Sequence, residues 1–111
     1  MTTHLSRADV ATDAAARYAK QLVAHLGRKI PFTTHGATST VTVEGTTLGI
    51  TTEDTTLTLT VTGTDPAAVA RGEHALGSHL ERSGARRGLT VTWARTTTDT
   101  AAVSNGQGAP R

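Results

Sequence analysis

The sequence predicts an α+β fold, a two-layer sandwich in which an antiparallel sheet carries two helices on one face. Three observations predict it. Between residues 30 and 62, apolar residues alternate with threonine, which is typical of strands with one buried and one wet face. Residues 14–28, and a second segment that starts at Pro66, have apolar residues at helical spacing. The length of 111 residues allows one domain with one core.

The first two elements are a strand and a helix. The strand covers residues 4–12, and its predicted buried face is Ser6, Ala8 and Val10. We expect Thr12 or Asp13 to cap the helix over 14–28, because a short side-chain oxygen accepts a free backbone N–H there. The core stripe of this helix is Ala15, Tyr18, Leu22 and Leu26.

The strands with alternating apolar and polar residues come next. The predicted order of elements along the whole chain is β-α-β-β-β-β-α-β. Turns at residues 44–46 and 53–54 separate the runs STVTVEG, TTLGITT and TTLTLTVTG. The predicted buried residues of these runs are Val41, Val43, Leu48, Ile50, Leu57, Leu59 and Val61. Threonine, with 24 of 111 residues, occupies the other face, where its β-branched side chain favours extended backbone.

The second helix has a strong start signal, with Asp65 as N-cap and Pro66 at the first helical position. Its apolar stripe is Val69, Ala75, Leu76 and Leu80. Residues 89–95, LTVTWAR, are predicted as the last strand. Its buried face is Leu89, Val91 and Trp93. Because residues 96–111 have no periodicity, we expect a domain over 1–95 and a disordered tail, with residues 98–111 dispensable for stability.

Composition restricts the function classes. The net charge is +2 and the basic residues are scattered, whereas a nucleic-acid footprint needs a concentrated Lys/Arg face. There is no cysteine, which excludes disulfides and thiolate chemistry. No apolar run approaches the length of a membrane span. We therefore expect a cytoplasmic protein that contacts neither nucleic acid nor membrane.

Two histidines at the margins of the helical stripes are the candidate ligand-binding residues. His25 is followed one turn later by Lys29, and His79 almost one turn later by Arg82. If the helices pack side by side, the two imidazoles meet in a groove that suits a carboxylate, phosphate or catecholate group. Alternatively, the histidines only complete the packing and the cations complement the helix dipoles. The residues leave both readings open.

Neither a metal site nor a phosphate-binding loop is predicted. His74 and His79 are five residues apart, which places them on different faces of one helix, and we expect His74 to be solvated. The run GEHALGSH lacks the lysine of a phosphate-binding loop and lies inside a helix.

Short motifs occur in a definite order along the chain. They are A-x-V-x-T at residues 8–12, the pair Arg17-Tyr18, then Leu22, His25 and Lys29, then His79, Leu80 and Arg82, and finally Arg86, Leu89, Val91 and Trp93. In this order and spacing, residues 6–95 resemble the bacterial domain-of-unknown-function family numbered 2218. The chain departs from the family pattern, which has a cysteine, two phenylalanines and a histidine at four positions. These positions hold Val23, Leu26, Ser83 and Arg28.

The resemblance carries expectations of its own. Members occur alone and attached to siderophore-interacting flavoproteins, so it implies an accessory role near iron acquisition, with a flavin-dependent reductase as partner. It also implies a layer like that of the TATA-binding protein. If the family holds a metal through cysteine and histidine, this chain has lost part of that set. His25, Lys29, His79 and Arg82 remain.

Three functions stay open at this point. The first is a binding or accessory module for an anionic small molecule. The second is a small enzyme in which His25 or His79 acts as general acid or base and Lys29 or Arg82 fixes an anion. The third is a structural domain that pairs with a second copy. The lack of a paired carboxylate or a nucleophile–base pair favours the module, and no particular cofactor is indicated.

Overall fold

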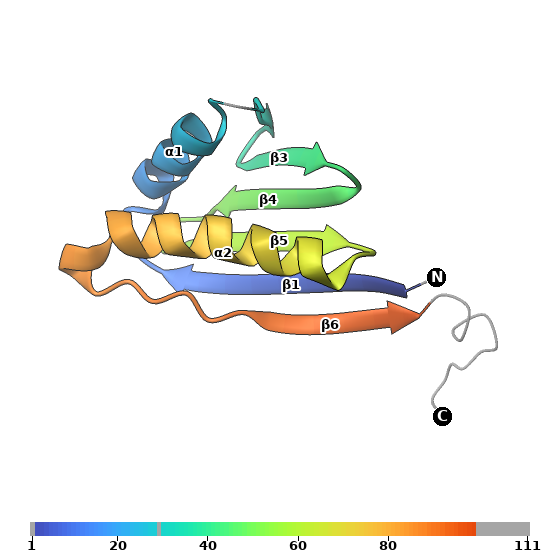
Figure 1. Ribbon diagram of the computed structural model, residues 1–111. Helices are drawn as coiled ribbons and strands as arrows, with labels where there is room; N and C mark the ends of the chain where they lie inside the picture. Colours follow the sequence, from blue (N-terminus) through green and yellow to red (C-terminus); the bar gives the residue numbers. More distant parts are fainter. Residues whose placement is uncertain (1, 29, 100–111) are drawn as a thin grey trace.

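A computed structural model describes residues 2–28 and 30–99, and its order of elements is the predicted β-α-β-β-β-β-α-β (Figure 1). The elements are β1 Thr2–Ala11, α1 Ala15–Leu26, β2 Thr33–His35, β3 Thr38–Val43, β4 Thr46–Thr52, β5 Thr56–Gly63, α2 Pro66–Ser83 and β6 Ala94–Asp99, with a short 3-10 helix, η1, at Ala85–Arg87.

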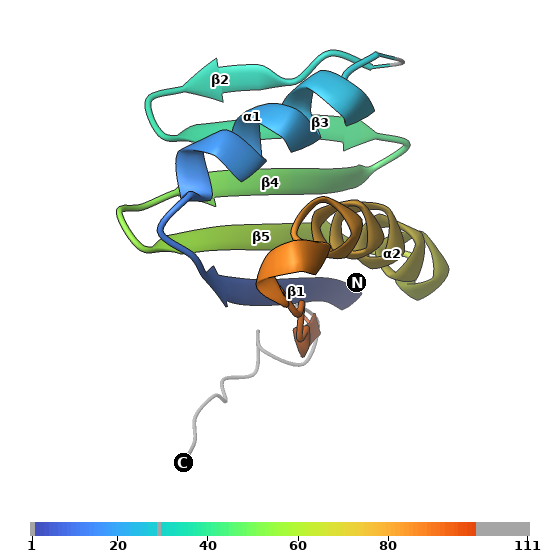
Figure 2. The same ribbon diagram turned by 90° about the vertical axis from the view of Figure 1, so that its left-hand side faces the viewer.

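The strands form one antiparallel sheet in the order β2-β3-β4-β5-β1-β6. Figure 2 shows both helices on the same face of this sheet. In that view α1 lies over the β3–β4 side and α2 over the β5–β1 side. The predicted α+β fold class is therefore confirmed. Within the described residues, neither helix is at once long and apolar enough to cross a membrane.

The strand register places the apolar residues under the helices, as predicted. Leu57 pairs with Val10 and Leu59 with Ala8, and all four are buried. The threonines of β5 lie on the opposite face, where Thr58 pairs with Asp9 and donates a hydrogen bond to its carboxylate at 2.8 Å. This bond is the main reason that the pKa of Asp9 is lowered. A slip of one residue would have inverted both faces.

The start of α1 differs from the prediction. The N-cap is Ala14, without a side-chain hydrogen bond, and neither Thr12 nor Asp13 caps the helix. The backbone N–H of Thr12 still donates to Thr55 O at 3.0 Å, so sheet-like pairing continues to this residue and the helix begins later. The Thr12 hydroxyl accepts the N–H of Ala14 at 3.1 Å, and Asp13 pairs with Arg87.

The start of α2 confirms the prediction, because the Asp65 carboxylate accepts the N–H of Ala67 at 3.0 Å and Pro66 occupies the first turn. The helix packs closely on the sheet. A Cβ added at Gly72 would lie 2.8 Å from Val61 Cγ1, which is closer than real Cβ contacts allow. A side chain at this position would have to displace Val61, so the close approach of helix to strand favours glycine there.

The last strand is the main correction. Residues 89–95 were predicted to form it, but β6 starts at Ala94 and continues to Asp99, paired with β1 from Arg7 to Thr2. In the preceding segment, two N–H groups donate outside the sheet: that of Leu89 to Gly84 O at 3.2 Å and that of Val91 to the Glu81 carboxylate at 2.9 Å. The side chains of Leu89, Val91 and Trp93 are partly buried against the core without being in a strand.

The domain boundary moves with that strand. Residues 96–99 were expected in a disordered tail, yet they lie in β6 along β1 (Figure 1). The rest of the predicted tail, residues 100–111, lies outside the described residues.

Candidate functional site

The two histidines singled out from the sequence lie in contact between α1 and α2. The ring centroids of His25 and His79 are 4.1 Å apart and the ring planes are tilted by 53°. The predicted approach of the two rings is therefore confirmed. The His25 side chain is exposed, whereas His79 is half-buried.

The buried stripes of the two helices position these rings. His25 follows Leu22 by three residues and His79 follows Leu76 by three, so each histidine lies beside a leucine that is at most 2 % exposed. Leu80, next to His79, is fully buried as well. The leucines belong to the buried core, and the histidines at the stripe margins meet each other between the helices.

A hollow of about 500 Å³ opens around the two rings. Its lining residues are Gln21, Leu22, Ala24, His25, Arg28, His79, Arg82 and Ser83. Two arginines and no acidic residue are among them. Arg82 was predicted for this site, whereas Arg28 was not, although its position three residues after His25 is visible in the sequence. Lys29, which was also predicted, lies outside the described residues.

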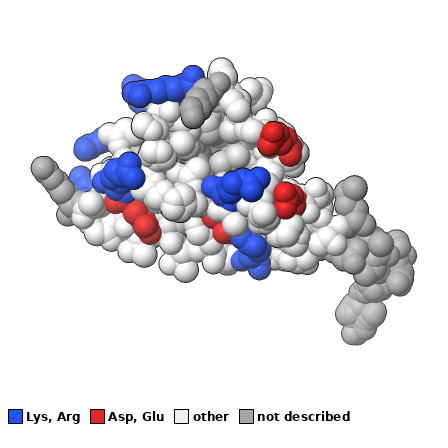
Figure 3. Space-filling view, viewed as in Figure 1, with Lys and Arg blue, Asp and Glu red and all other residues white. Residues whose placement is uncertain are grey.

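The electrostatics of the hollow favour neutral imidazole at His79. Burial lowers the pKa of His79 below its usual value, and the neighbouring His25 and Arg82 lower it further. A neutral imidazole offers one N–H donor and one acceptor nitrogen. In the view of Figure 3, basic side chains without acidic ones among them lie at the upper left, where Figure 1 places α1.

The side chains present suit an anion better than a metal ion. Arginine offers several donors to a carboxylate or phosphate, and a charged donor strengthens each bond. In residues 2–28 and 30–99, no three or more His, Cys, Asp or Glu side chains come together to hold a metal. The two arginines in the hollow would also repel a cation.

The family model described as "Uncharacterized protein conserved in bacteria (DUF2218)" matches residues 7–94. The chain belongs to this family. The resemblance inferred from its motifs is thereby confirmed. The comparison with curated proteins returned no match.

The NMR structure of PA4090 from Pseudomonas aeruginosa is similar to this DUF2218 chain, with a TM-score of 0.68 and 20% sequence identity. The similarity covers 85% of this chain and 96% of that chain. At this identity the similarity supports the fold of the DUF2218 chain and not its function.

A polar cluster on the other side of α2 was not predicted. The Glu73 carboxylate accepts hydrogen bonds from the buried Ser6 hydroxyl and from Arg95, whose Nη2 lies 2.8 Å from Oε1. These contacts tie β1 and β6 to α2. Because Ser6 and Glu73 are 67 residues apart and belong to no common motif, the sequence contains no signal for the cluster.

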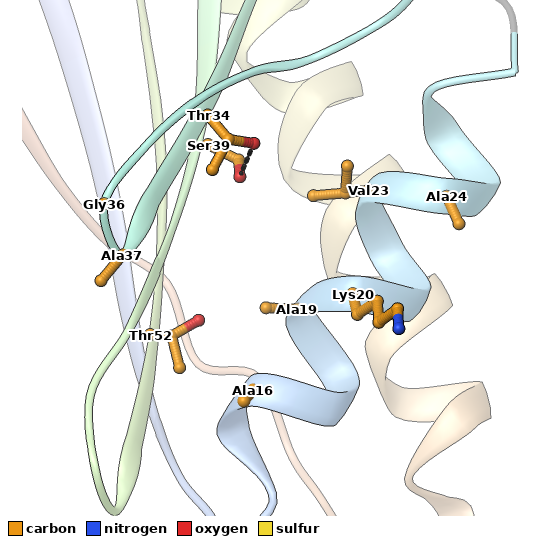
Figure 4. Close-up of a pocket in the computed structure, with 10 residues that line it drawn as sticks. All are labelled: Ala16, Ala19, Lys20, Val23, Ala24, Thr34, Gly36, Ala37, Ser39 and Thr52. Carbon is orange, nitrogen blue, oxygen red and sulfur yellow. Dashed lines mark hydrogen bonds between the residues drawn. The ribbon is translucent and has the colours of Figure 1, made fainter.

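A second hollow lies on the opposite side of α1, against β2, β3 and the end of β4 (Figure 4). It has a volume of about 600 Å³. Most of its lining side chains are alanine, threonine or serine, which form no recognisable motif. Sequence reasoning therefore missed it.

Proposed function

We propose that this DUF2218 protein is a binding module for a small anion, held between α1 and α2. One observation carries the proposal: His25 and His79 are in contact, with ring centroids 4.1 Å apart, in a hollow whose described lining residues include two arginines and no acidic residue. The anion is held through a carboxylate, phosphate or catecholate group, for which imidazole N–H and guanidinium groups are suitable donors. Lys29, four residues after His25 in the sequence, is proposed as a further cation on the evidence of the sequence.

Each residue has a distinct part in this proposal. Arg28 and Arg82 supply fixed positive charge from the ends of the two helices. His25 and His79 donate hydrogen bonds from opposite helices, so both helices are needed for the complete site. His79 takes up a proton when the anion binds, because the negative charge offsets the burial and the neighbouring charges that keep it neutral in the free protein.

The anion that we propose as ligand can belong to a siderophore or to its ferric complex. Catecholate and carboxylate groups bind ferric iron in siderophores, and the family resemblance associates such domains with flavoproteins that reduce them. In this proposal the domain acts in the cytoplasm, either retaining an anionic chelate or product or docking on a flavin-dependent reductase. The support is the flavoprotein association that the motif resemblance implies, together with the two arginines of the hollow.

A second candidate function is acid–base catalysis by His79. The observation in its favour is the lowered pKa, which leaves a neutral imidazole available as a general base near pH 7. If His79 is catalytic, the bound anion should be converted to a product. If the domain is a binding module, the anion should remain unchanged. Mass analysis of a retained ligand before and after incubation separates the two.

The test is native mass spectrometry of the full chain purified from its own host. The intact protein is expected to retain an anionic ligand, and His25→Ala and His79→Ala are each expected to lose it while the fold is kept. His74→Ala is the matched control, because His74 lies exposed on α2 outside this hollow.

Two outcomes would contradict the proposal. In one, both variants retain the ligand as well as the unmodified chain does. In the other, no ligand is retained, and His25→Ala and His79→Ala only destabilise the domain by about 0.5–3 kcal/mol, as expected if the ring contact merely packs α1 against α2. The histidines would then be structural.

A further inference from the structure

The hollow between α1 and the β2–β4 side of the sheet has two chemically different walls. From α1, Ala16, Ala19 and Val23 point toward the sheet with methyl groups (Figure 4). Hydroxyl groups lie opposite, on residues Thr34, Ser39 and Thr52 (Figure 4). The space between the walls is therefore a slot with one apolar face and one hydrogen-bonding face.

The hydroxyl wall has hydrogen-bonding capacity to spare. Thr34 Oγ1 and Ser39 Oγ are 2.8 Å apart and share one hydrogen bond, in which either can donate. The pair has two hydroxyl protons, and this bond uses one of them. Among the described residues, neither side chain has another hydrogen-bond partner, and Ser39 is only 9% exposed. One donor at the floor of the slot is thus available to a ligand.

The charge of the slot defines the ligand further. Among the described residues that line it, Lys20 alone is charged, and its side chain extends away from the hydroxyl wall (Figure 4). The polar contacts inside the slot are therefore neutral. The volume of about 600 Å³ is within the roughly 300–1,000 Å³ of small-molecule sites.

We infer that this slot binds an uncharged planar aromatic compound that has hydroxyl or carbonyl oxygens on one edge. Its apolar edge packs against the methyl groups of Ala16, Ala19 and Val23, and the edge that bears the oxygens lies at the opposite wall. Its oxygens accept the spare proton of the Thr34–Ser39 pair or bond to Thr52. An acyl chain would fill the same space but would leave the hydroxyl wall without partners. The site is distinct from the histidine hollow, because the two lie on opposite sides of α1 and share only Ala24.

The test is a titration of the full chain with 2-naphthol, followed by ¹H–¹⁵N correlation spectra. Saturable shifts are expected at the amides of residues 16–24 and 34–39. Ala16→Leu places a larger side chain into the slot from an exposed helical position and is expected to weaken binding by roughly tenfold or more. Ala70→Leu, the same change at an exposed position of α2, is the control and leaves the affinity unchanged.

A second variant covers the case in which Ala16→Leu disturbs the fold. The double variant Thr34→Val, Ser39→Ala removes the hydroxyl pair and keeps the slot open. It is expected to weaken the binding of 2-naphthol more than the binding of naphthalene, which has no oxygen. His79→Ala is expected to leave 2-naphthol binding intact. Shifts confined to other surfaces would overturn the inference, as would equal affinity in the intact chain, Ala16→Leu and the hydroxyl variant.

Discussion

The two helices both present small residues to the sheet, with opposite results. On α2, Gly72 allows the helix to approach Val61 closely, and Val69, Leu76 and Leu80 have no exposed surface. On α1, Ala16 faces serine and threonine side chains, and a slot of about 600 Å³ remains between the layers. Small residues close a helix–sheet interface only where large side chains flank them or lie opposite.

The difference separates a stabilising side of the molecule from a binding side. The α2–β5–β1 side supplies most of the fully buried side chains. Both hollows that carry a functional proposal adjoin α1, one toward α2 and one toward β2 and β3. We expect stability to respond to changes between α2 and the sheet, and ligand binding to respond to changes at the residues that line the two hollows, including His79 and Arg82 of α2.

The largest stability effect is expected at Leu76. Leu76→Ala leaves a cavity under α2 and should lower the free energy of unfolding by about 2–5 kcal/mol. Val23→Ala on α1 is the matched change, and it should cost about 1 kcal/mol or less because Val23 is half-buried beside an open slot. Urea unfolding of both variants measures the difference. Equal losses would remove the distinction between the two sides.

A smaller effect is expected at Glu73. Glu73→Ala leaves the fully buried Ser6 hydroxyl without its acceptor and releases Arg95, at a cost of about 1–3 kcal/mol. Glu53→Ala in an exposed turn is the control and should stay within about 0.5 kcal/mol of the unmodified chain. If both changes cost the same in thermal unfolding, the Ser6–Glu73–Arg95 contacts do not stabilise β6 against α2.

The next prediction compares the stability of two variants, one with a methyl group added between α2 and the sheet and one with a larger side chain on α1. Gly72→Ala gains about 1 kcal/mol of helix propensity but forces a contact with Val61, which costs about 1–3 kcal/mol. The net change should be destabilising by up to about 2 kcal/mol. Ala16→Leu extends into open space and should be within about 0.5 kcal/mol of neutral. A stabilising Gly72→Ala would show that α2 has room to move.

The smallest stability effect concerns the end of the chain. A chain that ends at residue 97 loses two β6 residues that pair with Thr3 and Thr2, and its melting temperature should fall by no more than a few degrees. A chain that ends at residue 95 loses four paired residues and should melt lower than the first. Identical melting temperatures would place the domain boundary at 95, as the sequence pattern alone indicated.

The fold was predictable because its strongest signals are local. Alternation in β4 and β5 determined which face is buried, and the Asp65-Pro66 pair marked the start of α2. The prediction was wrong where a hydrogen bond to a residue outside the segment determines the backbone conformation. Val91 and Trp93 have a strand-like pattern, but Glu81 binds the backbone of Val91 and the pairing with β1 begins only at Ala94.

The candidate site was predictable in part for the same reason. His25 and His79 each lie at the margin of an apolar stripe, and two helices on one sheet face bring such margins together. The sequence did not indicate Arg28 as part of the hollow, since a basic residue after a helix is usual in any case. The slot beside Ala16 is open because the side chains that line it are small. The alternation of apolar and polar residues indicates which face of a strand is buried, but it gives no information on how well side chains fill the space above that face.

The anion site makes a prediction about pH with a definite sign. In the free protein the pKa of His79 is lowered, so the folded state binds fewer protons than the unfolded state between that pKa and 6.5. The stability that neutral His79 contributes is present above pH 6.5 and is lost as the pH falls through its pKa in the folded protein. An anion that binds next to the ring stabilises the imidazolium form and therefore raises the pKa of His79. The affinity of the protein for the anion should accordingly rise as the pH falls.

The most direct test is an NMR titration of the histidine ring protons against pH, with and without inorganic phosphate. Without phosphate, His79 should titrate below 6.5. With phosphate, its pKa should rise, while the ring-proton signals of exposed His74 on the same helix should not respond to phosphate. A His79 curve that phosphate leaves unchanged, or an equal shift at His74, would contradict an anion site between α1 and α2.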